Sequence, residues 1–422
     1  MKKEKSKIFG SLSYQKIFFL ITAFTSFSWL VLVLIDYEPR IYIFFLKFND
    51  FLADFANAVW YSVDLDPYRS PYNKPSEHCG TALYFIVYWL FSGFLDKSAE
   101  PSHLAWQQPV LMNAILLYYM GIGSCIFLSL YEMKKGSRPV KFFTTFFLLF
   151  SAIFMFTVER GNIVILGFLL SLFFICNYNN DNKVIREISF IMLAIAAGIR
   201  VAPALLGVVL LFEKRWKEAA RLVVYGLIFF IIPFFIVQPW GSSNLTDTLR
   251  LFIENMKSND EAYKSLPYSC GFSSMFAPWI YNDLLLSKIE RSISFIMSAV
   301  ILISYPRQEC KWKKLMALIL VMIMLPQHSL RYNLIFLLPV IVMFLDEEKH
   351  RSVDVLYFLL FLSMLCPLYL GFNRSDTYFL PGGIMFILFF ADSAALLINK
   401  FRSKNKGGND GTGNREEGCP VQ

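Results

Sequence analysis

Long apolar segments separated by short polar ones run along the 422 residues of the chain. A bilayer core about 30 Å thick needs about 20 apolar residues per helix. The segments lack the period-two alternation of barrel strands, so they are expected to be helical. The pattern predicts an all-α polytopic membrane protein with about 12 transmembrane helices. The expected spans are residues 17–35, 81–95, 109–131, 141–158, 162–178, 188–212, 219–237, 289–305, 315–325, 332–345, 353–371 and 378–398.

Two of these spans are irregular. Segment 81–95 is short, and segment 188–212 is interrupted by Gly198, Arg200 and Pro203, which favours two half-helices. Loops rich in Lys and Arg are retained on the cytoplasmic side of a membrane. The Lys residues before the first span therefore predict a cytoplasmic N-terminus, and with twelve crossings most other basic loops are also cytoplasmic. The basic loop at 134–138 would lie outside. Either this loop breaks the bias, or an early apolar segment does not cross and segment 188–212 crosses twice.

Composition supports the membrane assignment, because 56% of the residues are hydrophobic and 44 are Phe. The net charge of +8 is explained by cytoplasmic anchoring residues and contact with membrane lipids, so nucleic acid is not an expected partner. A single transmembrane domain is expected over 1–400, with outer loops at 37–80 and 238–288. The Gly-rich and charged tail, 401–422, is expected to be disordered and cytoplasmic.

The first outer loop carries the candidate catalytic residues. Asp50, Asp54 and Asn57 share one face of a predicted amphipathic helix at the outer membrane interface. A carboxylate at the edge of hydrocarbon is partly desolvated, which suits it to deprotonate a hydroxyl. An ordinary solvated helix face is the alternative. Asp66 and Tyr68 follow in a predicted turn.

Several segments resemble glycosyltransferase family 87, the polyprenol-phosphate-sugar-dependent enzymes of the GT-C fold. The resemblance rests on Asp54-Phe-Ala-Asn57 with Asp66-Pro-Tyr68, on Arg160-Gly-Asn162 heading a span, on Gly198-Ile-Arg200-Val-Ala-Pro203 followed by Lys214-Arg-Trp216, and on Pro326-Gln-His-Ser-Leu-Arg-Tyr332. It extends from about residue 50 to 345. The chain departs from the family pattern where Glu77-His-Cys-Gly80 replaces Tyr-Pro-Pro, where Arg200 replaces Lys, and where Asn162 replaces Gln.

The resemblance implies a GT-C-like bundle with outer-face juxtamembrane helices and an inverting sugar transfer that needs neither a metal nor a cofactor. The donor would be a polyprenyl-phosphate-linked sugar, mannose or another hexose, and the acceptor a lipid or glycan. Asp54 would be the general base, with Asp50 as the alternative. Asn57, Asp66 and Tyr68 are the expected sugar or acceptor contacts.

The leaving polyprenyl phosphate needs cations, because negative charge develops on it in the transition state. Arginine offers a bidentate fork to phosphate oxygens. The candidate donor-phosphate residues are Arg160, Arg200, His328, Arg331 and Tyr332. Pairing with Glu159 is the alternative for Arg160, and interfacial anchoring is the alternative for His328, Arg331 and Tyr332.

The sequence therefore predicts a multi-pass glycosyltransferase of the cell membrane, the inner membrane of a bacterium, that works at the outer face of the cell envelope. A polysaccharide polymerase or a flippase or transporter of lipid-linked glycans would share the spans and the intramembrane Arg residues. The outer acidic segment, 50–68, favours the transferase, because a transporter needs no base there.

Overall fold

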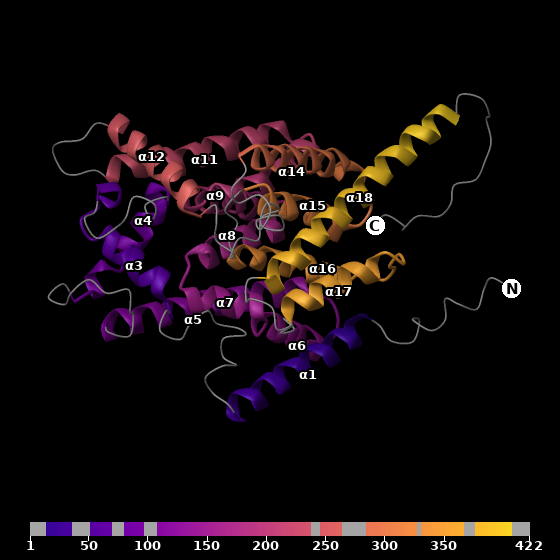
Figure 1. Cartoon of the computed structure of the whole chain (residues 1–422), viewed down its shortest axis with the longest axis horizontal. Helices are drawn as coiled ribbons and strands as arrows, with labels where there is room; N and C mark the ends of the chain where they lie inside the picture. The colour runs from indigo at the N-terminus through magenta and orange to yellow at the C-terminus, as the bar shows by residue number, and fades with distance from the viewer. Residues whose placement is uncertain are drawn as a thin grey trace.

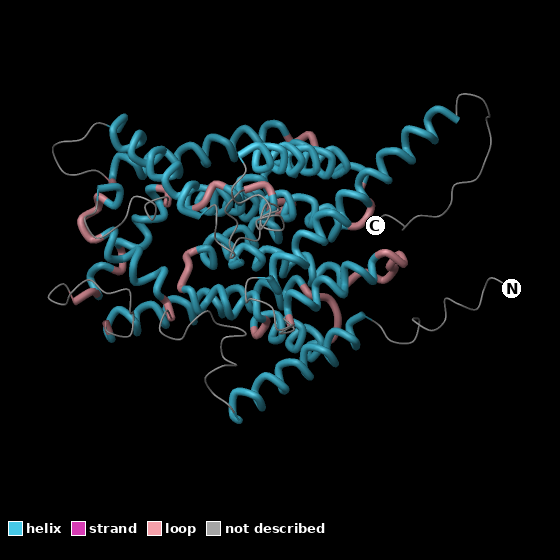
Figure 2. Tube along the Cα trace, in the orientation of Figure 1, coloured by secondary structure: helices cyan, strands magenta, loops and turns pink. Residues whose placement is uncertain are grey.

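The structure, a computed structural model, describes residues 14–35, 51–69, 80–96, 108–237, 245–263, 284–326, 331–366 and 376–406. These residues form helices and no strands (Figures 1 and 2). The α-helices are α1 (Tyr14–Ile35), α3 (Ala53–Ser62), α4 (Ala82–Trp89), α5 (Pro109–Met133), α6 (Arg138–Leu149), α7 (Ala152–Arg160), α8 (Val164–Asn177), α9 (Lys183–Ile199), α10 (Val208–Phe212), α11 (Trp216–Ile236), α12 (Leu245–Tyr263), α14 (Leu284–Ser304), α15 (Lys311–Met324), α16 (Leu338–Leu345), α17 (Asp354–Leu365) and α18 (Asp376–Lys406). The 3-10 helices are η2 (Pro67–Arg69), η4 (Ser92–Phe94), η6 (Ala202–Gly207), η8 (Tyr305–Arg307) and η9 (Arg331–Leu337).

The all-helical prediction is confirmed, but the count of about 12 spans is not. Within the described residues, 4 helices are long and apolar enough to cross a membrane: 109–133, 216–236, 288–307 and 381–400. The pair α6 and α7, bent by 50°, makes a fifth if it counts as one span. Other apolar helices are shorter. The 12 residues of α17, for example, fall below the length that a helix needs to cross hydrocarbon.

Helix α15 is the centre of the bundle. Every residue from Met316 to Met324 is buried, so the helix is apolar on all sides, as a central helix must be. Helix α11 is also apolar but leaves many large side chains exposed, among them Val224, Leu227 and Phe235. An apolar face of this extent is typical of a helix that contacts lipid.

The irregular segment 188–212 is broken, as its sequence predicts. Helix α9 ends at Ile199, and Arg200 adopts an extended conformation. Helices η6 and α10 then return to Phe212, whose ring stacks on Tyr305 with centroids 4.5 Å apart. Glu218, just after this segment, pairs with Arg186 in the first turn of α9 over 3.4 Å, so the chain returns to the end at which α9 begins.

The expected span 81–95 contains α4 and η4, an apolar segment shorter than the candidate membrane spans. The Thr81 hydroxyl donates to the carbonyl oxygens of Gly198 (2.6 Å) and Ile199 (2.9 Å), at the C-terminal end of α9. At its other end, Asp96 N–H donates to Gln108 Oε1, just before α5, over 2.9 Å. With only 8 residues, α4 covers about 12 Å and stays at one end of the molecule.

The basic loops lie together at the opposite end. Lys134, after α5, forms an ion pair with Asp346, after α16. The Tyr14 ring at the start of α1 lies 4.3 Å from His350 in the same α16–α17 loop. Lys313 at the start of α15 bonds Asp354 over 3.1 Å. Figure 1 shows the start of α1 and the end of α18 toward this end and α3, α4 and α12 at the other.

The loop 238–288, expected at the outer face, contains α12, which begins at Leu245. The C-terminal tail differs in extent from its prediction. Helix α18 continues to Lys406, past Arg402, where the sequence predicts disorder. The rest of the tail lies outside the described residues.

Candidate functional site

Asp54 lies on α3 and is held by the turn between α7 and α8. Its Oδ1 atom forms an ion pair with Arg160, and its Oδ2 atom accepts a hydrogen bond from Asn162 Nδ2 over 3.2 Å. The Asp54 side chain remains 24% exposed. A carboxylate offers about four lone-pair sites. Two are used here, so the group retains the capacity to accept a hydrogen bond from a ligand hydroxyl.

Helix α3 is more buried than an interfacial helix. Of its ten residues, Asp54, Asn57 and Tyr61 are the ones that are not buried, and they share one face. The opposite face carries Phe55, whose ring lies 4.7 Å from Tyr88 and 6.1 Å from Tyr119. The predicted amphipathic helix is therefore present, but its apolar face packs on α4 and α5 within the protein.

Gly161 allows α3 to approach the α7–α8 turn. Its φ of +68° lies in the left-handed region, which glycine adopts without strain. A Cβ atom at this position would lie 2.9 Å from Leu52 Cα and 3.1 Å from Phe55 Cβ. Leu52 N–H also donates to Glu159 O over 2.7 Å. The missing side chain thus brings the start of α3, and with it Asp54, against Arg160 and Asn162.

Asn162 makes two further hydrogen bonds around the same turn, and its neighbour Ile163 makes a third. Its side-chain oxygen accepts from Val164 N–H (3.1 Å), and its carbonyl oxygen accepts from Tyr119 OH (3.1 Å). The next residue, Ile163, donates its N–H to Tyr88 OH over 3.1 Å. Aromatic side chains from α4 and α5 therefore hold the turn that holds Asp54.

Arg200 lies in a second group of residues on the far side of α8. Its guanidinium donates to Asn333 Oδ1 over 3.3 Å and lies 5.1 Å from the centre of the Tyr332 ring. Arg200 and Asn333 line a cavity of about 50 Å³ with Val164 and Pro326. The break after α9 places the guanidinium there, because Arg200 leaves the helix in an extended conformation.

Arg331 is buried at the start of η9, and its guanidinium lies 5.1 Å from the centre of the Phe156 ring. Phe156 and Arg160 are four residues apart on α7 and so lie on one face of that helix. Val164, the first residue of α8, contacts both groups. It lines the cavity of Arg200, and its N–H donates to the side-chain oxygen of Asn162, which binds Asp54. The structure therefore joins Asp54 to Arg160 and Asn162 in one group and Arg200 to Tyr332 and Asn333 in a second group, and Arg331 lies against Phe156 of α7.

Other predicted residues occupy different surroundings. Asn57 shares the partly exposed face of α3 with Asp54. Asp66 pairs with Arg69 over 3.1 Å. Tyr68 is buried, donates its OH to Gly80 O over 3.0 Å and packs against Phe85, Phe234 and Phe252. Asp50 and His328 lie outside the described residues, and the roles predicted for all five remain predictions.

Two residues that sequence reasoning missed belong to these groups. Asn333 bonds Arg200, and its place directly after Arg331 and Tyr332 at the head of an apolar segment was the available signal. Thr81 bonds the last carbonyls of α9, and nothing in its sequence surroundings pointed there. No group of three or more His, Cys, Asp or Glu side chains within the described ranges is arranged to hold a metal ion.

Comparison with known proteins identifies the family. The model of glycosyltransferase family 87 matches residues 81–326, more than half of the chain, including Arg160, Asn162 and Arg200. Neither the curated proteins nor the solved structures gave a match. Asp54 and Arg331 lie outside the matched segment but contact residues within it. The chain belongs to glycosyltransferase family 87.

Proposed function

We propose that this glycosyltransferase moves a sugar, mannose or another hexose, from a polyprenyl-phosphate donor to a lipid or glycan acceptor with inversion at the anomeric carbon. An acceptor oxygen forms the new bond to that carbon while the bond to the phosphate oxygen breaks. Asp54 takes the proton of the attacking hydroxyl. Polyprenyl phosphate leaves with the bonding electron pair.

The observation that carries this proposal is the contact of Asp54 with Arg160 and Asn162. A general base must be oriented before it is useful, because proton transfer depends on hydrogen-bond geometry. The two partners bind one carboxylate oxygen each, and the Asp54 side chain stays 24% exposed, so a ligand hydroxyl can reach it. Arg160 in this scheme positions the base rather than binding phosphate.

Arg200 and Arg331 are the proposed phosphate ligands. Both lie near the α7–α8 turn, and Arg200 opens onto the cavity with Asn333. At about 50 Å³ that cavity is far below the roughly 300–1,000 Å³ of small-molecule sites, so donor binding must move η6 and η9 apart. Tyr332, against Arg200, would donate its OH to the same phosphate.

The proposed orientation puts this site at the outer face. Cytoplasmic loops carry an excess of Lys and Arg, and the basic loops of this chain gather at the end that holds Tyr14, Lys134 and Lys313. The 14 residues of α8 separate that end from the α7–α8 turn by about 21 Å. The segments would cross twelve times if 81–95 stays outside and 188–212 crosses twice.

The test is Asp54→Asn in purified protein, assayed with a panel of polyprenyl-phosphate sugars. Loss of a general base costs about 100-fold to 10,000-fold in rate, so transfer should fall by at least that order while expression is kept. Asp64→Asn, at an exposed carboxylate just after α3, is the matched control and should keep full activity. Full transfer by both Asp54→Asn and Asp50→Asn would refute the mechanism.

A further inference from the structure

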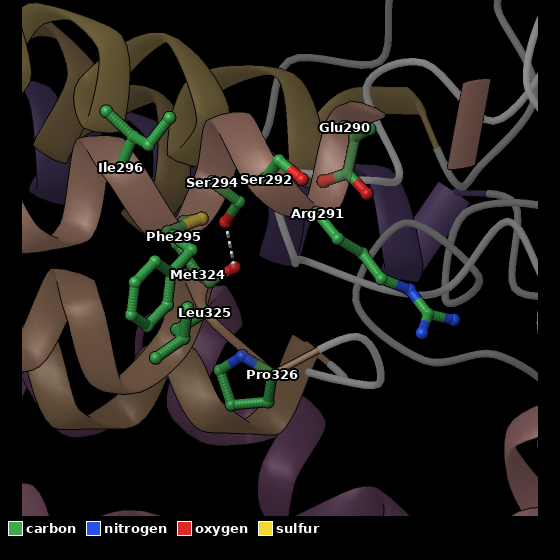
Figure 3. Close-up of a pocket in the computed structure, with 9 residues that line it drawn as sticks. All are labelled: Glu290, Arg291, Ser292, Ser294, Phe295, Ile296, Met324, Leu325 and Pro326. Carbon is green, nitrogen blue, oxygen red and sulfur yellow. Dashed lines mark hydrogen bonds between the residues drawn. The ribbon is translucent and has the colours of Figure 1, made fainter. Parts of the chain in front are cut away.

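A second cavity lies between α14 and α15. It has a volume of about 450 Å³, within the range of small-molecule sites. Figure 3 shows Glu290 and Arg291 at one side of it and Phe295, Ile296 and Leu325 at the other. The cavity is lined by Met324, Leu325 and Pro326, at the opposite end of α15 from Lys311 and Lys313, so it lies away from the basic loops.

Glu290 is the unusual residue of this cavity. It is 7% exposed and belongs to a segment that is apolar and long enough to span a membrane. Its carboxylate has no hydrogen bond or ion pair with any residue in the described part of the chain. A buried carboxylate without a partner is costly and marks a functional group in a membrane protein. The hydroxyl groups of a ligand would supply the missing hydrogen bonds.

The other side of the cavity is apolar and open to lipid. Phe295 and Ile296 are 64% and 59% exposed, and they lie about 8 to 9 Å along α14 from Glu290, toward the membrane interior. A ligand that satisfies both sides has a hydroxyl-bearing head and a hydrocarbon chain. A phosphate head fits less well, because the opposite charges of Glu290 and Arg291 leave this side of the cavity without a net positive charge.

Pro326 lines this cavity and also the cavity of Arg200 and Asn333. The two spaces are therefore neighbours at the end of α15. The Arg200 cavity has a guanidinium and no carboxylate among its lining residues, which suits phosphate. The α14–α15 cavity has a carboxylate, Glu290, beside the guanidinium of Arg291, which suits sugar hydroxyls. This division matches a reaction with two substrates of different head-group chemistry.

We propose that the α14–α15 cavity binds the acceptor, and that the acceptor is a membrane-embedded glycolipid. Its sugar hydroxyls donate to Glu290, its ring oxygens accept from Arg291, and its hydrocarbon chain lies along Phe295 and Ile296. The inference rests on the proposed function, since it assigns the second substrate of the same reaction. It narrows the acceptor from a lipid or glycan to a sugar that carries its own lipid chain.

The probe is dodecyl maltoside with a photoreactive diazirine in its alkyl chain, added to the purified full-length chain in amphipol. Cross-linked peptides, mapped by mass spectrometry, should include Phe295 or Leu325. Excess dodecyl maltoside should prevent labelling, whereas dodecyl phosphate or maltose should not. Glu290→Gln should reduce labelling about tenfold, the effect of losing a hydrogen bond to a charged group.

Two further variants test whether the label binds in this cavity. Ile296→Trp fills the apolar side from an exposed position, so it should block labelling without disturbing the core. Glu309→Gln, at an exposed carboxylate beyond the other end of α14, should label normally. Unchanged labelling in both Glu290→Gln and Ile296→Trp, or equal competition by dodecyl phosphate, would overturn the proposal.

Labelling needs no turnover, which separates this proposal from the proposed function. The Asp54→Asn chain should be labelled like the unaltered chain. If labelling follows the predictions while Asp54→Asn transfers sugar normally, the catalytic proposal is wrong and the glycolipid cavity stands. If Asp54→Asn is inactive while Glu290→Gln is labelled as strongly as the unaltered chain, the proposed acceptor site is wrong and the assignment of Asp54 as the base stands.

Discussion

At the scale of single residues, the Asp54–Arg160 pair joins two segments that are more than a hundred positions apart in the chain. Removing one member of a half-buried pair leaves the other charge poorly compensated. Arg160 is therefore expected to matter for the orientation of Asp54 as well as for its charge. Asn162 holds the second carboxylate oxygen, which limits rotation of the group about its last torsion.

Substitution of Gly161 by Ala should displace α3 without unfolding the bundle. A non-glycine residue at positive φ costs about 1–3 kcal/mol, and the new Cβ would meet the backbone of Leu52. Misplacement by about 1 Å can cost on the order of 100-fold in rate. We expect Gly161→Ala to lose transfer activity by that order while donor binding persists. Gly121→Ala, at an exposed position of α5 where an added Cβ would meet no atom within 4 Å, is the control.

Substitution of Arg200 by Gln should weaken donor binding. A bond from a guanidinium to a charged group contributes about 1.5–3 kcal/mol, so the KM for the polyprenyl-phosphate sugar should rise by about 10-fold to 150-fold. Steady-state kinetics with varied donor measures this effect. Arg307→Gln, at the basic end of the molecule, should leave the KM unchanged, and an equal KM for both variants would contradict the assignment of Arg200.

At the scale of elements, the site is built from helix ends rather than helix middles. The last four carbonyl groups of an α-helix lack partners within the helix. The hydroxyl of Thr81 binds two of those of α9, and its oxygen also accepts from Tyr84 N–H at the start of α4. This one side chain therefore holds the end of α9, where Arg200 begins, against α4.

Thr81→Val keeps the shape of the side chain and removes its hydroxyl. Loss of the cap and of the bonds to α9 should lower the free energy of unfolding by about 1–2 kcal/mol. Thermal unfolding in detergent should therefore occur at lower temperature, and the KM for the donor should rise because Arg200 is less well placed. Thr81→Ser retains the hydroxyl and should behave like the unaltered chain. A Thr81→Val protein as stable as the Thr81→Ser protein would show that these bonds contribute little.

At the scale of the whole molecule, contacts between loops decide the topology. The ion pair of Lys134 with Asp346 places the α5–α6 loop beside the α16–α17 loop. The sequence alone did not decide on which side of the membrane the α5–α6 loop lies. If the α16–α17 loop is cytoplasmic, as its Lys and Arg residues indicate, the α5–α6 loop is cytoplasmic as well.

Cysteine labelling tests this topology in right-side-out vesicles from a version of the chain without other cysteines. A membrane-impermeant maleimide should label Asp64→Cys, after α3, from outside. It should label Ser137→Cys and Asp181→Cys after the vesicles are made permeable and not before. All three positions are exposed. Labelling of Ser137→Cys in sealed vesicles would mean that segment 81–95 crosses the membrane after all.

The apolar pattern by itself indicated that the chain is helical and that several helices are long enough to span a membrane, because only helices and closed barrels satisfy backbone polar groups in hydrocarbon and the segments lack the alternation of barrel strands. The same pattern marked the break in segment 188–212, since Gly198, Arg200 and Pro203 all disfavour a continuous helix there. Local residues also pointed to Asp54 and Arg200 as chemistry-bearing groups.

Only the tertiary structure decided which of these residues meet. Apolar character does not distinguish a crossing helix from one packed at an end, so the place of α4 depends on Thr81 and Gln108 finding distant partners. Likewise, no feature of the sequence around Arg160 predicts that it pairs with Asp54. That contact exists because Gly161, lacking a side chain, lets α3 come within van der Waals distance of the turn.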